Sequence, residues 1–134
     1  MRNESRGAPL FAEHMPTHVV ERGPERVVLE TEFSGPHLNA AGTVHGGMIA
    51  SLFDMALTGA AKASVNDGVG TFGVTLSLTI HFMQPVGSGR ARCESVVMGG
   101  GSRTKFVDAK LFDSMGQLAA TATSTVRVID LDGQ

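Results

Sequence analysis

The fold is decided by NAAGTVHGG (residues 39–47) and by MIASLFDMALTGAAKA (residues 48–63), into which it leads. From Gly46 to about Ala63 the apolar residues cover most of a helical wheel, which predicts one long helix. The polar residues of this segment recur at spacings of three and four and form one narrow stripe: Ser51, Asp54, Thr58 and Lys62. We expect a helix this apolar to be surrounded by the rest of the chain.

The segments on either side of this helix have the pattern of strands. Two short strands are predicted before it, at residues 17–21 and 26–33, with turn residues between them at 23–25. Four are predicted after it, at residues 72–82, 90–98, 104–112 and 117–129. A helical turn is expected at residues 10–15 and a loop at residues 36–44. This is an α+β arrangement, in which a curved antiparallel sheet wraps around one long central α-helix.

The clearest strand pattern lies at residues 72–82, where apolar and other residues alternate strictly. One set predicts a single apolar face: Phe72, Val74, Leu76, Leu78, Ile80 and Phe82. Thr75 belongs to the other set. On this pattern alone Thr75 is an ordinary polar residue on the outer face of the strand.

Composition limits the classes of protein to which this chain can belong. With 134 residues, 42% of them hydrophobic, we expect a single domain over residues 1–134, with residues 1–9 flexible. A net charge of −2, without a dense basic block, argues against a nucleic-acid partner. With 5% aromatic residues, the chain cannot bury both faces of the sheet alone, so we expect a second copy to cover part of it.

Location is predicted from the cysteine count and from the apolar segments. Cys93 is the single cysteine, so the chain has no internal disulfide and no Cys-x-x-Cys pair, which favours a reducing cytoplasm. The N-terminal residues have no signal-peptide core. The apolar stretch at residues 48–63 is shorter than the roughly 20 residues of a membrane helix, so no membrane association is expected.

The glycines at the start of the predicted helix are candidates for a catalytic site. The N-terminus of a helix has free N–H groups and a partial positive charge, and Gly46 and Gly47 carry no side chain that blocks access to them. A carbonyl oxygen that becomes an oxyanion could therefore be stabilised there. Two alternatives stay open: the glycines only form a tight bend, and His45 only holds the loop by hydrogen bonding.

Asp54 is the second candidate for chemistry, although it could simply mark the solvated edge of the helix. It follows Gly46 by eight residues, which corresponds to roughly 12 Å along the helix axis. One carbonyl group cannot contact both residues of the same helix. If both act on one substrate they come from two chains, most simply a homodimer with two-fold symmetry.

Asn39-x-x-Gly42-x-x-His45-Gly46-Gly47, followed by Leu52, Asp54 and Ala56, resembles the signature of the hotdog-fold acyl-CoA thioesterases of the phenylacetate-degradation (PaaI-like) group. The strand Val74-Thr75-Leu76-Ser77-Leu78, with Phe82-x-x-Pro85 after it, is similar to the same family. So is the closing segment Asp113-x-x-Gly116-x-Leu118-x-Ala120-x-Ala122-x-x-Thr125. The resemblance runs from about residue 27 to residue 128.

The resemblance implies hydrolysis of an acyl-CoA or aryl-acyl-CoA thioester to the free acid and CoA. It implies that Asp54 is the nucleophile or general base and that the N–H of Gly46 of the partner subunit polarises the carbonyl. Asn39 would orient the thioester or the water, His45 would brace the loop, and Thr75 would place a hydroxyl near the carboxylate. Against this, Asn39 in a loop is commonly a turn former.

The resemblance also concerns the contacts with coenzyme A. Family members often carry a basic residue directly after a glycine near residue 101, whereas this chain has Ser102 there and Arg103 next. Arg103, Lys105 and Arg90 are therefore candidates for the CoA phosphates, with the alternative that they are solvated charges at strand edges.

The resemblance implies a homodimer that forms the active site, with tetramers common among relatives, no metal and no cofactor other than the CoA of the substrate. The chain has no Gly-x-Ser-x-Gly elbow and no His-Glu-x-x-His arrangement, which argues against a serine hydrolase and a zinc protease. Two other functions remain open: a non-catalytic acyl-CoA sensor or carrier, and a hydratase or dehydratase that uses His45 and Asp54. Four residues could line the acyl pocket or fill the core: Met48, Phe53, Phe72 and Met83.

Overall fold

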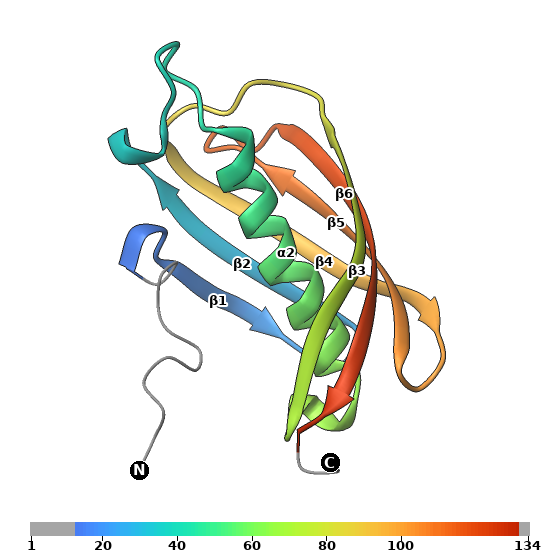
Figure 1. The fold of residues 1–134 in the computed structure, drawn as a ribbon. Helices are drawn as coiled ribbons and strands as arrows, with labels where there is room; N and C mark the ends of the chain where they lie inside the picture. Colours follow the sequence, from blue (N-terminus) through green and yellow to red (C-terminus); the bar gives the residue numbers. More distant parts are fainter. Residues whose placement is uncertain (1–12, 132–134) are drawn as a thin grey trace.

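The computed structural model describes residues 13–131, which form one sheet and one long helix (Figure 1). The strands are β1 (Thr17–Arg22), β2 (Arg26–Phe33), β3 (Thr71–Phe82), β4 (Gly89–Gly100), β5 (Thr104–Phe112) and β6 (Leu118–Asp130). The helix is α2 (Gly46–Ala63), and two short 3-10 helices are η1 (Gly35–His37) and η2 (Asn66–Gly68). The predicted order of elements is confirmed, and each predicted strand boundary lies within two residues of the observed one.

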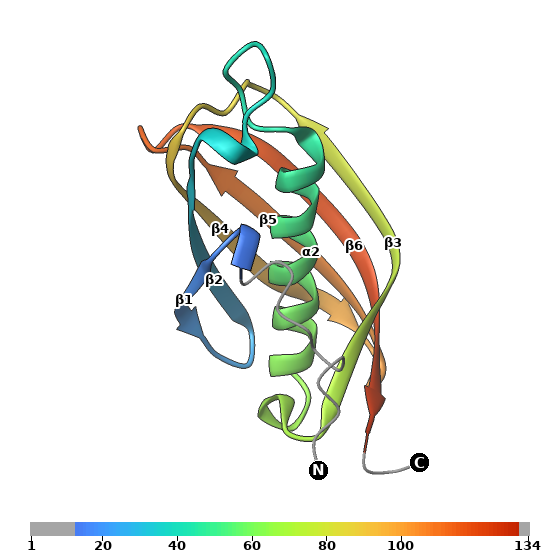
Figure 2. The ribbon, with the colours of Figure 1, turned by 60° about the vertical axis from the view of Figure 1, so that its left-hand side comes forward.

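The sheet has the strand order β1-β2-β4-β5-β6-β3, and every neighbouring pair is antiparallel. It curves around α2, which lies across one face (Figures 1 and 2). The predicted antiparallel sheet around one long helix is therefore confirmed. Among residues 13–131, strands β1 and β3 form the two edges of the sheet, so within this range β3 is hydrogen-bonded to one strand, β6.

The core lies between α2 and the inner face of the sheet. The helix contributes Leu52, Phe53, Ala56 and Leu57, each at most 1% exposed. Small residues such as Ala91 and Ala120 face them from the strands and let the sheet approach the helix closely. Burial of this apolar surface holds α2 in place, and with it the two ends of the candidate site.

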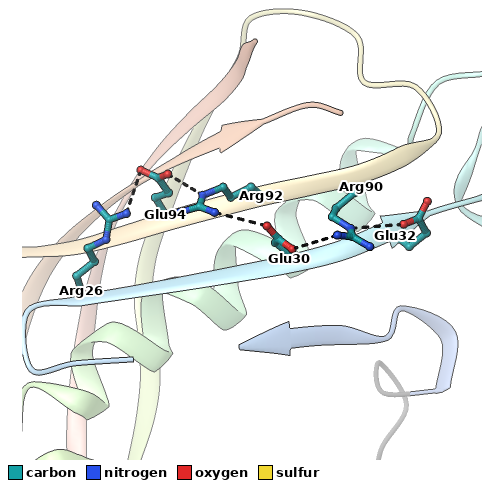
Figure 3. A network of polar contacts seen from close by, with 6 residues as sticks. All are labelled: Arg26, Glu30, Glu32, Arg90, Arg92 and Glu94. Carbon is teal, nitrogen blue, oxygen red and sulfur yellow. Dashed lines mark hydrogen bonds and ion pairs between the residues drawn. The ribbon is translucent and has the colours of Figure 1, made fainter. Parts of the chain in front are cut away.

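The outer face of the sheet carries a row of opposite charges across β2 and β4. The ion pairs run in sequence along Arg26, Glu94, Arg92, Glu30, Arg90 and Glu32 (Figure 3). Their distances range from 2.9 to 3.9 Å, and Arg90 and Glu32 at one end of the row are 70% and 65% exposed. Pairs at an exposed surface contribute little to stability, so at this end the row mainly keeps the face polar.

The strict alternation predicted for residues 72–82 is wrong at one point. The register of β3 against β6 shifts between Thr75 and Ser77, because Leu76 is an extra residue in a β-bulge. As a result Thr75 is opposite Val126 on the inner face, whereas Phe72 and Val74 point away from the helix. The bulge turns Thr75 toward α2.

Two predicted features lie partly or wholly outside the described residues. Glu13 and His14 are helical, whereas the earlier part of the turn expected at residues 10–15 is not described. The predicted flexibility of residues 1–9 also lies outside them. Within residues 13–131, no helix combines the length and apolar character needed to span a membrane.

Cys93 provides a test of the packing on the inner face. Its side chain is buried on β4, and this burial, with a smaller effect from the negative charge of Glu94, raises the pKa of its thiol. Because the thiolate is the reactive form, we expect iodoacetamide at pH 8 to leave Cys93 unmodified in the native protein. Mass spectrometry should show one carboxamidomethyl group only after unfolding. Rapid labelling of the native protein would contradict the packing.

Candidate active site

The site begins at the N-terminal end of α2, where the glycines lie. His45 is the N-cap residue, and its carbonyl accepts hydrogen bonds from the N–H groups of Met48 at 3.0 Å and Ile49 at 3.3 Å. In a trans peptide the C=O and the N–H point in opposite directions, so the N–H of Gly46 points out of the helix end. Gly46 and Gly47 are exposed, and their N–H groups have no hydrogen-bond partner among the described residues. Two amide donors are thus available to a ligand.

An open cavity of about 240 Å³ adjoins this helix end. Its walls come from the helix start, the loop before it, the end of β3 and the segment after β3: Val44, Gly46, Ile49, Phe82, Met83, Gln84, Pro85 and Val86. The Phe82 ring lies beside Gly46, since a Cβ atom added to that glycine would be 3.4 Å from Phe82 Cζ. The free N–H of Gly46 therefore lies next to a cavity whose side chains are mostly apolar.

Of the four residues named as candidates for the pocket, Met83 lines this cavity. Phe53 is buried in the core, and Met48 packs against the core from its edge. Phe72 is half exposed and, before the bulge in β3, points away from the helix.

Asp54 lies in the middle of α2, against the inner side of the edge strand β3. Thr75 Oγ1 donates a hydrogen bond of 2.5 Å to Asp54 Oδ1. The Thr58 hydroxyl donates instead to the backbone carbonyl of Asp54, at 2.8 Å. The carboxylate is partly buried, and its Oδ2 atom has no hydrogen-bond partner among the described residues. Asp54 is thus more than a solvated edge of the helix: one oxygen is held and the other is available.

Gly46 and Asp54 do not meet within the protomer, because eight residues of one helix separate them. Each has its own neighbour on β3. Phe82 lies beside Gly46, and Thr75 holds Asp54. Strand β3 therefore connects the two halves of the candidate site along one edge of the sheet.

The side chain of Asn39 makes its hydrogen bonds within the loop before the helix. Its Oδ1 accepts hydrogen bonds from the N–H groups of Ala41 and Thr43, at 2.9 and 3.1 Å, and its Nδ2 donates to Thr43 Oγ1 at 2.9 Å. These contacts are those of a turn former. The loop also joins the cavity wall, where the N–H of Val44 donates to the carbonyl of Val86 at 2.7 Å.

His45 is exposed, and its backbone rather than its ring makes the hydrogen bonds of the loop: its N–H donates to the carbonyl of His37 at 3.0 Å. No sequence pattern singles out His37, which is buried in η1 and contacts two other segments. One of its partners is His14, 23 residues earlier, and no local pattern indicates a pairing over that distance.

The basic residues proposed for coenzyme A are not gathered at one place. Arg90 points to the outer face of the sheet, away from α2, and pairs there with Glu30 and Glu32 (Figure 3). Arg103 lies in the β4–β5 turn and forms a 2.8 Å ion pair with Asp130. Lys105 is half-buried at the start of β5, opposite Val126.

The described part of the chain holds no group of three or more His, Cys, Asp or Glu side chains suited to a metal ion. Its polar features relevant to chemistry are the amide end of α2 and the Asp54–Thr75 pair.

Comparison with known proteins connects this geometry to a family. Residues 41–120 match the family described as the thioesterase superfamily. A protein of Saccharolobus solfataricus named "Putative esterase SSO2140" is 33% identical over 103 residues, which is 77% of this chain and 70% of that protein.

Solved structures agree on the fold. Smu.793 of Streptococcus mutans, bound to acetyl CoA, has a TM-score of 0.76 and 26% identity, over 85% of this chain and 89% of its own. The E. coli PaaI protein from the phenylacetic acid degradation operon has a TM-score of 0.78 and 21% identity, over 88% of this chain and 83% of its own. At that identity PaaI supports the fold alone. The chain belongs to the thioesterase superfamily and is a thioester hydrolase with the hotdog fold.

Proposed function

We propose that this protein hydrolyses acyl-CoA or aryl-acyl-CoA thioesters to the free acid and CoA, as a member of the PaaI-like group. Asp54 is the nucleophile or general base, and the N–H of Gly46 of the partner subunit polarises the thioester carbonyl. The observation that carries the proposal is the pairing of Thr75 with Asp54, which leaves Oδ2 available on a mainly apolar helix. The acetyl CoA bound to smu.793 supports the substrate class.

The available groups suffice for thioester chemistry. As a general base, Asp54 takes a proton from water, whose oxygen attacks the carbonyl carbon while the C–S bond breaks and CoA leaves as a thiolate. As a nucleophile, a carboxylate oxygen attacks the same carbon, the C–S bond breaks and CoA leaves as a thiolate, giving a mixed anhydride that water then hydrolyses to the free acid and the restored carboxylate. In both cases the oxyanion lies against the amide end of a helix. Water is the only co-reactant required.

A homodimer joined along β3 would complete the site. β3 is a 12-residue edge strand, and four apolar side chains on it or directly after it are at least half exposed: Phe72, Leu76, Phe82 and Met83. Long apolar edges of this kind favour pairing with another strand. Pairs of such dimers, giving a tetramer, are part of the proposal.

The arrangement of that pairing is suggested by the two contacts on β3. If two β3 strands pair antiparallel about a two-fold axis near the middle of the strand, the half that carries Thr75 runs beside the half of the partner strand that carries Phe82. Because Thr75 holds Asp54 and Phe82 lies beside Gly46, this arrangement brings the carboxylate of one subunit toward the amide end of the other helix.

The cavity beside Gly46 is the proposed position of the acyl group. Its 240 Å³ corresponds to about eight water-sized groups, which suits a short acyl or a single-ring aryl group. The Phe82 ring and Met83 are its adaptable apolar walls.

For the CoA nucleotide we retain Arg103, Lys105 and Arg90 as proposed contacts, with Gly47 at the carbonyl. The pair of Arg103 with Asp130 is at the surface, where exchanging a carboxylate for a phosphate costs little. A cytoplasmic location is also proposed, because the single cysteine is a buried free thiol.

The test is a panel of short, medium and aryl acyl-CoAs, incubated with the purified protein while free thiol is followed. We expect release of CoA from at least one class at rates typical of enzymes. Tight binding of acyl-CoA without thiol release would instead indicate a sensor or carrier. With a 3-hydroxyacyl-CoA as an additional substrate, a change in enoyl absorbance without free thiol would indicate a hydratase or dehydratase, and either result would overturn the proposal.

Thr75→Val should lower kcat for the best substrate by about tenfold or more, because the carboxylate loses the donor that fixes Oδ1. Valine keeps the shape and β-branching of threonine, so the strand should be preserved. Thr75→Ser keeps the hydroxyl and should retain most of the activity. Equal rates for the valine and serine variants would show that the hydroxyl has no role.

A further inference from the structure

His37 is buried at the turn between β2 and the loop that leads to α2. It is 5% exposed, and its ring packs edge-on against Phe33, with ring centroids 5.6 Å apart. Nδ1 accepts a hydrogen bond from the N–H of Ser34 at 2.9 Å. Nε2 contacts the carbonyl oxygen of His14 at 2.5 Å, so it carries the proton and donates. Both ring nitrogens are thus used, and the ring has one fixed orientation.

The backbone of His37 is fixed in the same way. Its N–H donates to the carbonyl of Ser34 at 2.8 Å, and its own carbonyl accepts the N–H of His45 at 3.0 Å. This residue therefore connects three segments: the chain at His14, the end of β2, and the N-cap of the helix. Among these contacts, the bond to His45 lies one peptide away from the proposed catalytic N–H.

The hydrogen bond from the His45 N–H to the His37 carbonyl constrains the orientation of the Gly46 N–H. The peptide between His45 and Gly46 is held through the His45 carbonyl, which accepts from Met48 and Ile49. The peptide that precedes His45 is held through its N–H, which donates to the His37 carbonyl. With both sides of His45 held, the N–H of Gly46 has a defined direction out of the helix end, beside the cavity.

We infer that His37 is a positioning residue for thioester hydrolysis: its two ring hydrogen bonds hold the carbonyl that orients the His45–Gly46 peptide toward the substrate. This inference rests on the proposed function of Gly46. Its physical basis is that an oxyanion donor acts only from a fixed position, and a displacement of about 1 Å can cost up to about a hundredfold in rate.

Three variants separate the two ring contacts. His37→Asn keeps an acceptor near the position of Nδ1 for the N–H of Ser34, and His37→Gln keeps a donor near the position of Nε2 for the carbonyl of His14. His37→Leu removes both. We expect kcat to fall by about tenfold or more in His37→Leu, with KM within about twofold, and to recover in part in the two amide variants.

Val128→Ala is the matched control for loss of stability. Val128 is fully buried on β6, opposite Gly73 near the C-terminal half of α2, far along the sheet from His37. All variants are assayed well below their melting temperatures. A kcat for His37→Leu equal to that of Val128→Ala would overturn the inference, since it would reduce His37 to a structural residue. If His37→Leu does not fold, the Asn and Gln variants are compared with the control in the same way.

A second measurement does not depend on activity. Hydrogen exchange followed by NMR should show faster exchange of the His45 amide in the His37 variants than in the wild type, with the Ala56 amide in the middle of α2 unchanged. Unchanged exchange at His45 would overturn the inference. If the wild type releases no thiol from any acyl-CoA, the proposed function fails, and the His45 amide alone then reports whether His37 holds this peptide.

Discussion

Asp54→Asn is expected to lower kcat for acyl-CoA hydrolysis by at least about a hundredfold, the scale of a lost base or nucleophile. Asparagine has the size of aspartate and can still accept the Thr75 hydrogen bond through its amide oxygen. What it loses is the negative charge and basicity of Oδ2. The expected result is therefore a loss of chemistry with little change in KM, measured as thiol release at saturating substrate.

Asp67→Asn is the matched control for this change. Asp67 is exposed in η2 and adopts a positive φ of 57°, a conformation that asparagine tolerates well. This variant loses the same charge outside the candidate site, so its kcat should equal that of the wild type. If Asp54→Asn and Asp67→Asn have the same activity, Asp54 has no catalytic role.

Most of the fold could be predicted because it depends on local patterns. The apolar wheel of residues 46–63 determines a buried helix, and alternating residues determine the strands that surround it. The antiparallel pairing of β4, β5 and β6 also follows, since short turns such as residues 113–116 connect neighbours in space, whereas the pairing of β3 with β6 and of β2 with β4 has no local signal. In the structure this turn is closed by the hydrogen bond from the N–H of Asp113 to the carbonyl of Gln117, at 2.9 Å.

The bulge in β3 could not be predicted in the same way. A strict alternation over residues 72–82 contains no signal for an extra residue at position 76, because the local sequence is compatible with a regular strand. The bulge places Thr75 on the inner face, beside Asp54, and keeps Leu78 and Ile80 on that face as well. The pattern therefore predicted a strand correctly but assigned its first half to the wrong face.

The loop before the helix also contains a contact that no local sequence pattern predicts. Asn39 could be read from sequence as a turn former, since its side chain bonds to residues within four positions. The role of His37 depends on His14, and such a contact exists only once the chain has folded. Hydrogen bonds between residues close in sequence were thus predictable, whereas contacts between distant residues depend on the folded arrangement of the whole chain.

Gly46→Pro is expected to lower kcat by about a hundredfold to a thousandfold, the effect of removing one oxyanion donor. Proline lacks the N–H group, which in this fold has no partner among the described residues. It is well tolerated at the first position of a helix, and the ψ of 136° at His45 is typical of a residue before proline. The melting temperature should therefore not fall, while thiol release does.

Gly46→Ala distinguishes the effect of losing the amide N–H from the effect of adding a side chain at this position. Its Cβ would lie 3.4 Å from Phe82 Cζ, so it fits with a small adjustment of the ring, and it keeps the N–H. We expect a loss of activity clearly smaller than that of the proline variant. A second control is Gly59→Ala in the same helix, where the new Cβ would be 3.8 Å from Val27 Cγ1 and outside the cavity. Equal activity of the proline and alanine variants would show that the amide is not the donor.

Mixing the two inactive variants tests whether residues of two chains form one active site. After subunit exchange between Asp54→Asn and Gly46→Pro, a mixed dimer has one site with an intact Gly46 and an intact Asp54, and one site with neither. With random pairing, half of the dimers are mixed, so activity should return to about a quarter of the wild-type value. If both residues acted within one chain, every site in every mixture would lack one of them, and no activity would return. Recovery on mixing would therefore follow from the geometry of α2, whose two functional positions are too far apart for one thioester to reach both.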